Sequence, residues 1–416
     1  MYGSSRWRIS DSARRQMTMP RGMEVVVPRG FSFSTAEAAI KKPGRKDLAL
    51  IFSEKEAVIS GVFTTNEVKA APVRIDMERI RLGKGQAIVA NSGNANACTG
   101  ERGIRDALEL SGMVASSIGV KADRVFICST GVIGTPLPME RITQKIPELI
   151  NGMGRSSIDD AATAIMTTDT FPKIAGRVIE IGKVRVHIAG MCKGAGMISP
   201  DMATMLCFLM TDALIERKAL SHALRDAVDD SFNRITVDGE RSTNDTVLAM
   251  ANGMAGNRVI RDGSRAFRTF ASGLSEVTEE LSRLIVRDGE GATKLVEIII
   301  KNAKSRGDAE KAAFNIANSL LVKTAIYGND PNWGRIMAVL GYSGIVVQED
   351  TCDISIGRVK VCRKGIATGR DSEAADMLKA DEVRIVVDLH IGNASSKVLT
   401  CDLTEEYVRT NAEYRT

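Results

Sequence analysis

Two hydrophobic periods alternate along the chain and predict both strands and helices. Short runs in which apolar residues are continuous or alternate with polar ones predict strands. They fall at 48–52, 57–64, 87–90, 125–128, 246–251, 295–300 and 383–391. Apolar residues spaced three or four apart predict helices. These lie around 110–118, 139–150, 158–166, 220–228, 264–285 and 310–321. Two segments predict hairpins. One joins the β-type runs 175–181 and 183–189, and the other spans 352–362.

Strands and helices follow one another in mixed runs rather than in strict alternation. This order favours an α+β layered sandwich, in which central mixed β-sheets are flanked by helices. With 416 residues the chain is long enough for two or three folding units, or for one large one. It can bury a sizeable core without disulfide or metal staples.

The middle of the chain, CKGAGMISPDMATMLCFLMTDA, changes character at Thr204. A Gly-rich segment precedes this residue, and a continuous apolar run after it predicts a buried strand. If the Ala203–Thr204 bond were cut, the Thr204 hydroxyl would lie beside its own free α-amine. A free α-amine can act as a general base near neutral pH, which would activate the hydroxyl without any histidine. The alternative is an intact chain in which Thr204 merely opens a strand.

Composition excludes several classes of function. The chain has 56 basic and 51 acidic residues and a net charge of +5, a small excess that does not indicate nucleic-acid binding. Only 4% of the residues are aromatic, which argues against base stacking. No apolar run approaches the length of a membrane span, so we expect no membrane partner.

Cysteine and histidine usage predicts a cytoplasmic protein without a metal site. The seven cysteines are odd in number and show no C-x-x-C spacing, a pattern typical of reduced thiols. None of the three histidines has a neighbour at metal-ligand spacing. We interpret His390, on the polar side of an alternating stretch, as structural.

Residues 1–25 are rich in Arg and Ser and contain few acidic residues. This composition predicts a disordered extension, or a start codon upstream of the native one. A transit peptide has a similar composition and is the alternative.

Gly-punctuated polar loops recur where predicted strands end. They include NSGNAN, STG, TTD, KGAGM, STND and DGEGATK. Such loops can build a pocket for a small polar ligand from backbone N–H groups, hydroxyls and a few charges. Each can also be an ordinary turn. None matches a P-loop or a dinucleotide-binding fingerprint.

From about residue 26 onward the sequence resembles the bifunctional ornithine acetyltransferase/N-acetylglutamate synthase family of arginine biosynthesis. The matching motifs occur in the expected order along the chain. They are GVFTTNEVKAAPV, NSGNANACTG, STGVIG, MTTDTFPK, KGAGM, MATML, STNDT, DGEGATK, KTAIYGNDPNWGRI and YVRTNAEYRT.

The resemblance implies a self-processed fold of the Thr-nucleophile type. The precursor would be cut between Ala203 and Thr204, dividing it into an α chain (26–203, after the extension) and a β chain (204–416). Thr204 would then take acetyl from N²-acetylornithine and pass it to glutamate. The Thr130 hydroxyl and the Gly131 backbone N–H would form the oxyanion hole.

The resemblance also implies a set of substrate-binding residues and an assembly. The binding residues are Thr167, Lys193, Thr204, Glu290, Asn411 and Thr416. Two α and two β chains would form an α2β2 heterotetramer. No cofactor is implied. Some relatives also use acetyl-CoA as a co-substrate, and no motif decides whether this chain does.

Two other functions stay open from sequence alone. The first is an amidase or aminopeptidase with the same Thr nucleophile, in which water accepts the acyl group. The second is a non-enzymatic protein that binds a small ligand. The latter predicts one intact band of 44.8 kDa on a denaturing gel, and self-processing predicts two bands near half that mass.

Overall fold

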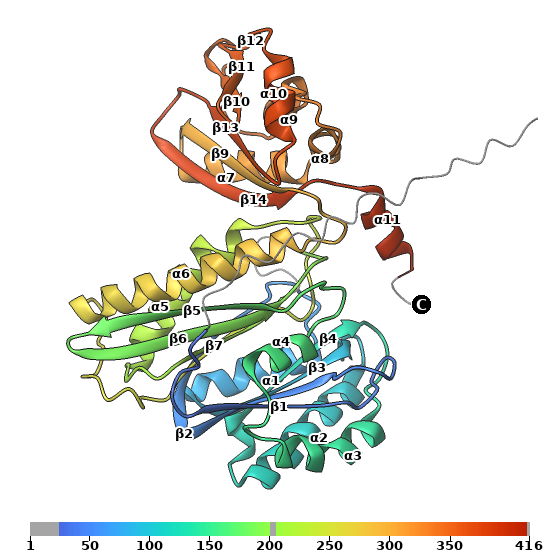
Figure 1. The fold of residues 1–416 in the computed structure, drawn as a ribbon, viewed down its shortest axis with the longest axis vertical. Coiled ribbons are helices and arrows are strands. Elements are labelled where there is room, and N and C mark those ends of the chain that lie inside the picture. The colour runs from blue at the N-terminus through green and yellow to red at the C-terminus, as the bar shows by residue number, and fades with distance from the viewer. Residues whose placement is uncertain (1–24, 200–204, 414–416) are drawn as a thin grey trace, which may run out of the picture.

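The computed structural model describes residues 25–199 and 205–413, which form two β-sheets with helices packed against them (Figure 1). The larger sheet has eight strands in the order β4-β3-β2-β8-β7-β6-β5, with β1 paired to β2. Its strands are β1 (Phe31–Ala36), β2 (Leu48–Phe63), β3 (Lys84–Asn94), β4 (Val125–Val132), β5 (Lys173–Ile181), β6 (Val184–Lys193), β7 (Leu206–Thr211) and β8 (Thr246–Ala251). The pairs β3/β4 and β7/β8 are parallel and the others are antiparallel, so the sheet is mixed.

The two halves of this sheet face each other across a shared apolar core, to which β2, β3 and β4 contribute from one side and β6, β7 and β8 from the other. Helices cover both outer faces, giving four layers in the order α-β-β-α (Figure 1). One outer layer consists of α1 (Ala71–Arg79), α2 (Gly100–Ile118) and α3 (Met139–Asn151). The other consists of α5 (Arg217–Asp230) and α6 (Arg265–Arg287). The short helix α4 (Ile158–Ala164) adds its apolar side to the central core.

Strands β7 and β8 are buried along their whole length, because both of their faces are covered. In β7, Leu206, Phe208 and Met210 point into the core between the two half-sheets, and Cys207 and Leu209 point toward α5 and α6. This explains why the sequence of β7 is continuously apolar rather than alternating.

The second sheet has six strands in the order β12-β11-β10-β13-β9-β14. They are β9 (Leu295–Ala303), β10 (Asp353–Ile356), β11 (Val359–Arg363), β12 (Ile366–Ala367), β13 (Glu382–Asp388) and β14 (Ala394–Cys401). Four helices share its apolar core, namely α7 (Arg306–Asn318), α8 (Leu320–Tyr327), α9 (Trp333–Tyr342) and α10 (Asp371–Leu378). The last helix, α11 (Glu405–Ala412), lies apart from this sheet, beside the loops of the larger unit (Figure 1). Short 3-10 helices are η1 (Ile80–Leu82), η2 (Ala122–Arg124), η3 (Phe232–Arg234) and η4 (Glu349–Thr351).

The α+β sandwich predicted from the sequence is confirmed, as are both hairpins, β5/β6 and β10/β11. The single helix predicted over 310–321 is wrong. Ser319 interrupts it, and the Ser319 side chain accepts a hydrogen bond from the backbone N–H of Val322 to begin α8. The two strands predicted over 48–64 are one long strand with an irregular register between Phe52 and Ala57.

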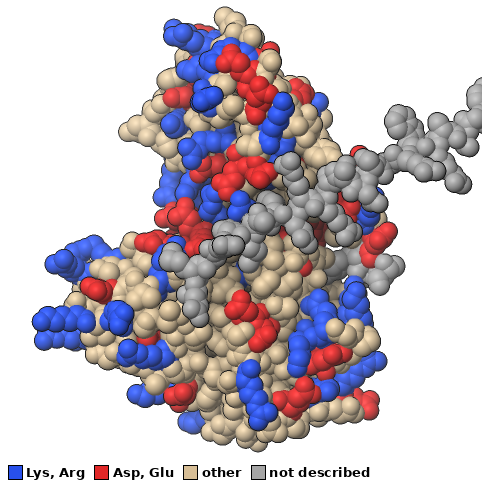
Figure 2. All heavy atoms as spheres, viewed as in Figure 1, with Lys and Arg blue, Asp and Glu red and all other residues tan. Residues whose placement is uncertain are grey.

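Basic and acidic side chains intermingle over both units on the face drawn in Figure 2. Among the helices in the described ranges, none has the length and apolar character needed to cross a bilayer. His390 follows β13, and its ring nitrogens lie 3.5 Å from Asp353 and 3.4 Å from Asp388. The predicted extension over 1–25 lies outside the described residues, apart from its last position.

Candidate active site

A pocket of about 220 Å³ opens where β4 and β6 end and where the segments leading into β7 and β8 begin. Several residues predicted as functional contribute to its wall. They are Thr130, Gly131, Thr167, Lys193, Glu290 and Asn411. These residues come from five separate segments of the chain, so the fold alone brings them together.

The Gly/Asn loops around the pocket are hydrogen-bonded to one another. Asn244 donates from Nδ2 to the backbone oxygens of Ala95 (2.6 Å) and Ser129 (2.8 Å). The Ser129 hydroxyl donates to Oδ1 of Asn91 at 2.6 Å. The three motifs NSGNAN, STG and STND therefore form one rigid wall rather than three independent turns.

Gly131 adopts a backbone conformation that requires glycine. Its φ is +135°, and a Cβ at this position would overlap the backbone of Gly93 and Asn94. This close approach lets the strand end at Thr130 and Gly131 line the pocket. A backbone N–H and a hydroxyl at a pocket wall are suitable donors for a developing oxyanion.

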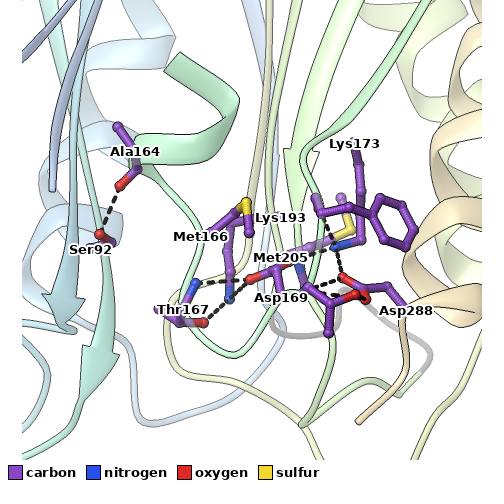
Figure 3. A network of polar contacts seen from close by, with 12 residues as sticks. Ser92, Ala164, Met166, Thr167, Asp169, Lys173, Lys193, Met205 and Asp288 are labelled. Carbon is purple, nitrogen blue, oxygen red and sulfur yellow. Dashed lines mark hydrogen bonds and ion pairs between the residues drawn. The ribbon is translucent and has the colours of Figure 1, made fainter. Parts of the chain in front are cut away.

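Lys193 is the basic residue of this pocket, and it points toward Thr167 (Figure 3). Its side chain is 3% exposed, and Nζ donates to Oγ1 of Thr167 at 2.8 Å. Oδ2 of Asp169 lies 3.8 Å from the same Nζ. The position of Lys193 at the end of β6 thus presents one cation to a bound carboxylate.

Asp169 lies between Lys193 and Lys173 and so connects the pocket to a buried ion cluster (Figure 3). Lys173 Nζ donates to Oδ1 of Asp169 at 2.7 Å and to Oδ2 of Asp288 at 2.5 Å. Burial alone would disfavour charge on all of these groups. At Asp169 the attraction outweighs burial, so that Lys193 and Lys173 hold the pKa of Asp169 well below its usual range, whereas at Asp288 burial prevails and raises the pKa. The two carboxylates likewise raise the pKa of Lys173, which keeps it protonated.

Glu290 occupies the loop after α6, on another part of the pocket wall. Its backbone N–H donates to the oxygen of Ala195 at 2.8 Å. Its Oε2 accepts a hydrogen bond from Nδ2 of Asn411 at 2.8 Å, so that α11 reaches the pocket. Gly196 packs against the Glu290 carboxylate so closely that a Cβ there would overlap it.

The predicted cleavage residues Ala203 and Thr204, and the predicted binding residue Thr416, lie outside the described residues. The described chain resumes at Met205, whose backbone N–H donates to Oδ1 of Asp245 at 2.8 Å. Asp245 is fully buried, and burial raises its pKa well above the ordinary value. The strand that follows Thr204 is thus held directly beside the STND motif.

Several residues at this site were not singled out from the sequence. Gly196, Met197 and Asn244 line the pocket, and Lys173 and Asp288 belong to the ion cluster behind it. All of them lie within or beside the polar loops noted above. What the sequence lacked was a signal for the long-range contacts among these loops.

A second pocket, of about 260 Å³, shares Gly131, Thr167 and Thr168 with the first. Its wall includes three basic residues of one loop, Lys41, Lys42 and Arg45. In residues 25–199 and 205–413, no three His, Cys, Asp or Glu side chains gather in a way that could hold a metal ion.

Fold and pocket together define a class of protein, a layered α+β sandwich with a small polar pocket whose wall includes one lysine and one glutamate. The chain belongs to the ArgJ family, whose model matches residues 32–416. It is similar to the arginine biosynthesis bifunctional protein ArgJ of Geobacter sulfurreducens, with 53% identity over 93% of this chain and 99% of the relative. It is also similar to the glutamate N-acetyltransferase of Methanocaldococcus jannaschii, with 45% identity over 94% of this chain and 98% of the relative.

Two solved structures of the same kind are similar to parts of the chain. One is the crystal structure of ArgJ from Bacillus halodurans, with 46% identity and a TM-score of 0.48 over 49% of this chain and 97% of that chain. The other is ornithine acetyltransferase from Mycobacterium tuberculosis in complex with ornithine, with 34% identity and a TM-score of 0.37 over 43% of this chain and 94% of that chain.

Proposed function

We propose that this chain is a glutamate N-acetyltransferase of arginine biosynthesis, which moves acetyl from N²-acetylornithine to glutamate. One observation carries the proposal: a single small pocket of an ArgJ-family protein presents both Lys193 and Glu290. Acetylornithine and glutamate share an α-carboxylate, which a lysine can bind. Ornithine adds a side-chain ammonium, which a glutamate can bind.

In the proposed reaction, the Thr204 hydroxyl attacks the acetyl carbonyl of N²-acetylornithine. The Thr204 α-amine accepts the hydroxyl proton and returns it to the leaving amine of ornithine. The α-amine of glutamate then attacks the acetyl ester on Thr204, the acyl C–O bond breaks, and the proton lost by the amine passes through the Thr204 α-amine to the departing hydroxyl oxygen. Donors from Thr130 and Gly131 stabilise both tetrahedral intermediates, and one such donor is typically worth about 3 kcal/mol.

The free α-amine requires prior cleavage of the Ala203–Thr204 bond, and we propose that the chain performs this cut itself. The Thr204 hydroxyl attacks the Ala203 carbonyl, and the resulting ester is hydrolysed. The products are a first chain ending at Ala203 and a second chain from Thr204 to the C-terminus. By family resemblance we expect an α2β2 assembly. The seven free cysteines support a reducing, cytoplasmic location.

We further propose acetyl-CoA as a second acetyl donor, on a specific observation. The charged lining of the pocket that adjoins the active site across Gly131 and Thr167 consists of three basic residues, Lys41, Lys42 and Arg45, and two acidic ones, Asp47 and Glu413. Basic side chains beside a transfer site suit a donor that carries phosphate groups.

A substrate panel tests the proposed activity on purified protein. Labelled N²-acetylornithine with glutamate should give labelled N-acetylglutamate with ping-pong kinetics. Acetyl-CoA replaces acetylornithine in a parallel arm, and peptide amides replace it in a third. Hydrolysis of the amides without acetyl transfer to glutamate would favour the amidase alternative and overturn the proposal.

A denaturing gel tests the proposed processing. The wild-type protein should run as two bands near half of 44.8 kDa, and Thr204→Ala as one intact band. Two bands from Thr204→Ala would show that another group, or a contaminating protease, cuts the chain.

A further inference from the structure

Four charged side chains lie in a row behind the active-site pocket, in the order Lys193, Asp169, Lys173 and Asp288. Their side chains are between 0% and 3% exposed. The row contains two cations and two anions, so its charges balance. Of these four, only Lys193 lines the pocket, and the other three have no part in the reaction proposed above.

We propose that Asp169 and Lys173 are positioning residues that direct the charge of Lys193 toward the substrate carboxylate. Lys173 is a buried counterweight, which offsets the charge of Asp169 and so keeps Asp169 from drawing Lys193 out of the pocket, and Asp288 competes with Asp169 for Lys173. The proposal rests on the function proposed above, and it adds residues that act through Lys193 rather than on the substrate.

The first argument is that Asp169 forms a hydrogen bond with Lys173 but not with Lys193. Its Oδ1 accepts hydrogen bonds from Lys173 Nζ at 2.7 Å and from the Gly194 N–H at 2.6 Å. Its Oδ2 accepts one from the Thr167 N–H at 2.9 Å, and Lys193 Nζ stays 3.8 Å away. This last distance is too long for a hydrogen bond. Because Lys173 already satisfies Asp169, Lys193 donates to the Thr167 hydroxyl at the pocket wall instead.

The second argument is the position of Asp288. It accepts hydrogen bonds from the backbone N–H and the hydroxyl of Thr170 and from Lys173. It also lies two residues before Glu290 in the loop after α6. The same cluster therefore joins the segment that carries Thr167 to the loop that carries Glu290. The link consists of the hydrogen bonds from Thr170, which an Asn at position 288 could also accept.

The alternative is an ion cluster that only stabilises the fold. Removing either partner of a buried ion pair leaves an uncompensated charge, so both roles predict a less stable protein. The two roles differ in what they predict for substrate binding. If the cluster is purely structural, KM should change in the same direction whichever partner of the ion pair is replaced. If Lys173 acts as a counterweight, KM should rise when Lys173 is replaced and should not rise when Asp288 is replaced.

The experiment compares Lys173→Met with Asp288→Asn, two changes of similar size on the same ion pair. In Lys173→Met, Asp169 has only Lys193 as a counter-cation and draws it from the pocket, so the KM for acetylornithine and for glutamate should rise about tenfold or more. In Asp288→Asn, Lys173 neutralises Asp169 even more fully, so both KM values should stay unchanged or fall. Lys360→Met is the matched control, because it removes a 2.6 Å pair with Asp353 in the second sheet and should leave KM unchanged.

Equal increases in KM for the two variants, or no increase in Lys173→Met, would overturn the proposal. If Lys173→Met does not fold, Thr170→Val replaces it, since Thr170 is an exposed residue whose hydroxyl donates to Asp288. Without this donor Asp288 attracts Lys173 more strongly, and KM should rise about threefold. An unchanged KM in Thr170→Val would then contradict the proposal.

A calorimetric titration separates failure of this proposal from failure of the proposed function. Ornithine is titrated into the wild-type protein and into both variants. If the wild type transfers no acetyl group but binds ornithine, the function is wrong, and the ratios of the dissociation constants still test the counterweight. Weaker binding in Lys173→Met but not in Asp288→Asn supports it, and equal weakening in both overturns it.

Discussion

At the scale of single residues, the space beside Gly196 determines where the Glu290 carboxylate lies. Gly196 has no side chain, and the carboxylate fills the volume that a Cβ would take. Its backbone needs no special conformation, since its φ is not in the left-handed region. The requirement for glycine here is therefore steric, and it concerns the pocket rather than the fold.

Replacing Gly196 by Ala should displace the Glu290 carboxylate and weaken the binding of acetylornithine. A lost hydrogen bond to a charged group is worth about 2 kcal/mol, so KM for acetylornithine should rise about tenfold or more. The melting temperature should change little. Steady-state kinetics and a thermal melt on the same preparation measure both. A large drop in melting temperature with unchanged KM would show that Gly196 serves the fold instead.

Glu290→Gln separates the two half-reactions. Only ornithine carries a side-chain ammonium, and the glutamate side chain is an anion that a carboxylate repels. The half-reaction that consumes acetylornithine should lose affinity about tenfold. Loading of glutamate onto a preformed acetyl-enzyme should be unchanged or improved. Equal losses in both half-reactions would mean that Glu290 acts on the end shared by the two substrates.

At this scale the polar motifs at strand ends predicted only that a pocket could form, and the family resemblance singled out particular residues of its wall. Thr130, Gly131 and Lys193 belong to such motifs, and all three line the pocket. The ion cluster could not be predicted in the same way. Thr170 and Asp288 are 118 positions apart, and no local pattern indicates that they meet.

At the scale of elements, helix α11 is held by a few polar contacts over the pocket and not by burial. None of its residues is buried. The Thr404 hydroxyl, just before the helix, donates to the Gly291 oxygen at 2.7 Å, and the Tyr407 hydroxyl donates to Asp238 at 3.3 Å. Asn411 reaches Glu290, as described above. The element therefore contributes to the site more than to the core.

A chain that ends at Thr404 should fold but bind acetylornithine poorly. Because no residue of α11 is buried, the melting temperature should fall by only a few degrees, about 1 kcal/mol of stability. Loss of the Asn411 contact to Glu290 should raise KM about fivefold. Asn411→Ala is the finer variant and should reproduce most of the increase. If truncation unfolds the protein and Asn411→Ala has no effect, α11 is a structural cap.

Elements differ in how well the sequence predicted them. The buried strands and the long helix α6 were predicted because each carries a sustained hydrophobic period. The break between α7 and α8 depends on one serine, and helices as short as α11 carry little apolar pattern. Their ends are decided by capping contacts and tertiary packing.

At the scale of the whole molecule, the predicted cleavage point does not coincide with the border between the two sheet units. It falls between β6 and β7, which are adjacent antiparallel strands of the larger sheet. The first chain would supply β1 to β6. The second would supply β7, β8 and the whole second sheet. Backbone hydrogen bonds and the shared core thus continue across the predicted cut.

This placement changes the molecularity of refolding. An intact precursor closes its sheet in a first-order reaction, since β6 and β7 are tethered. Once cut, the two chains must find each other in solution, and recovery after denaturation becomes second order.

Recovery of the processed protein from urea should therefore increase with protein concentration, and recovery of Thr204→Ala should not. Light scattering and far-ultraviolet circular dichroism over a dilution series measure the difference. Concentration-independent recovery of both would place the cut outside the folded sheet. The predicted cleavage would therefore make folding a single event: the fold would form once, from one intact chain, and slow unfolding would then preserve it in the two-chain protein.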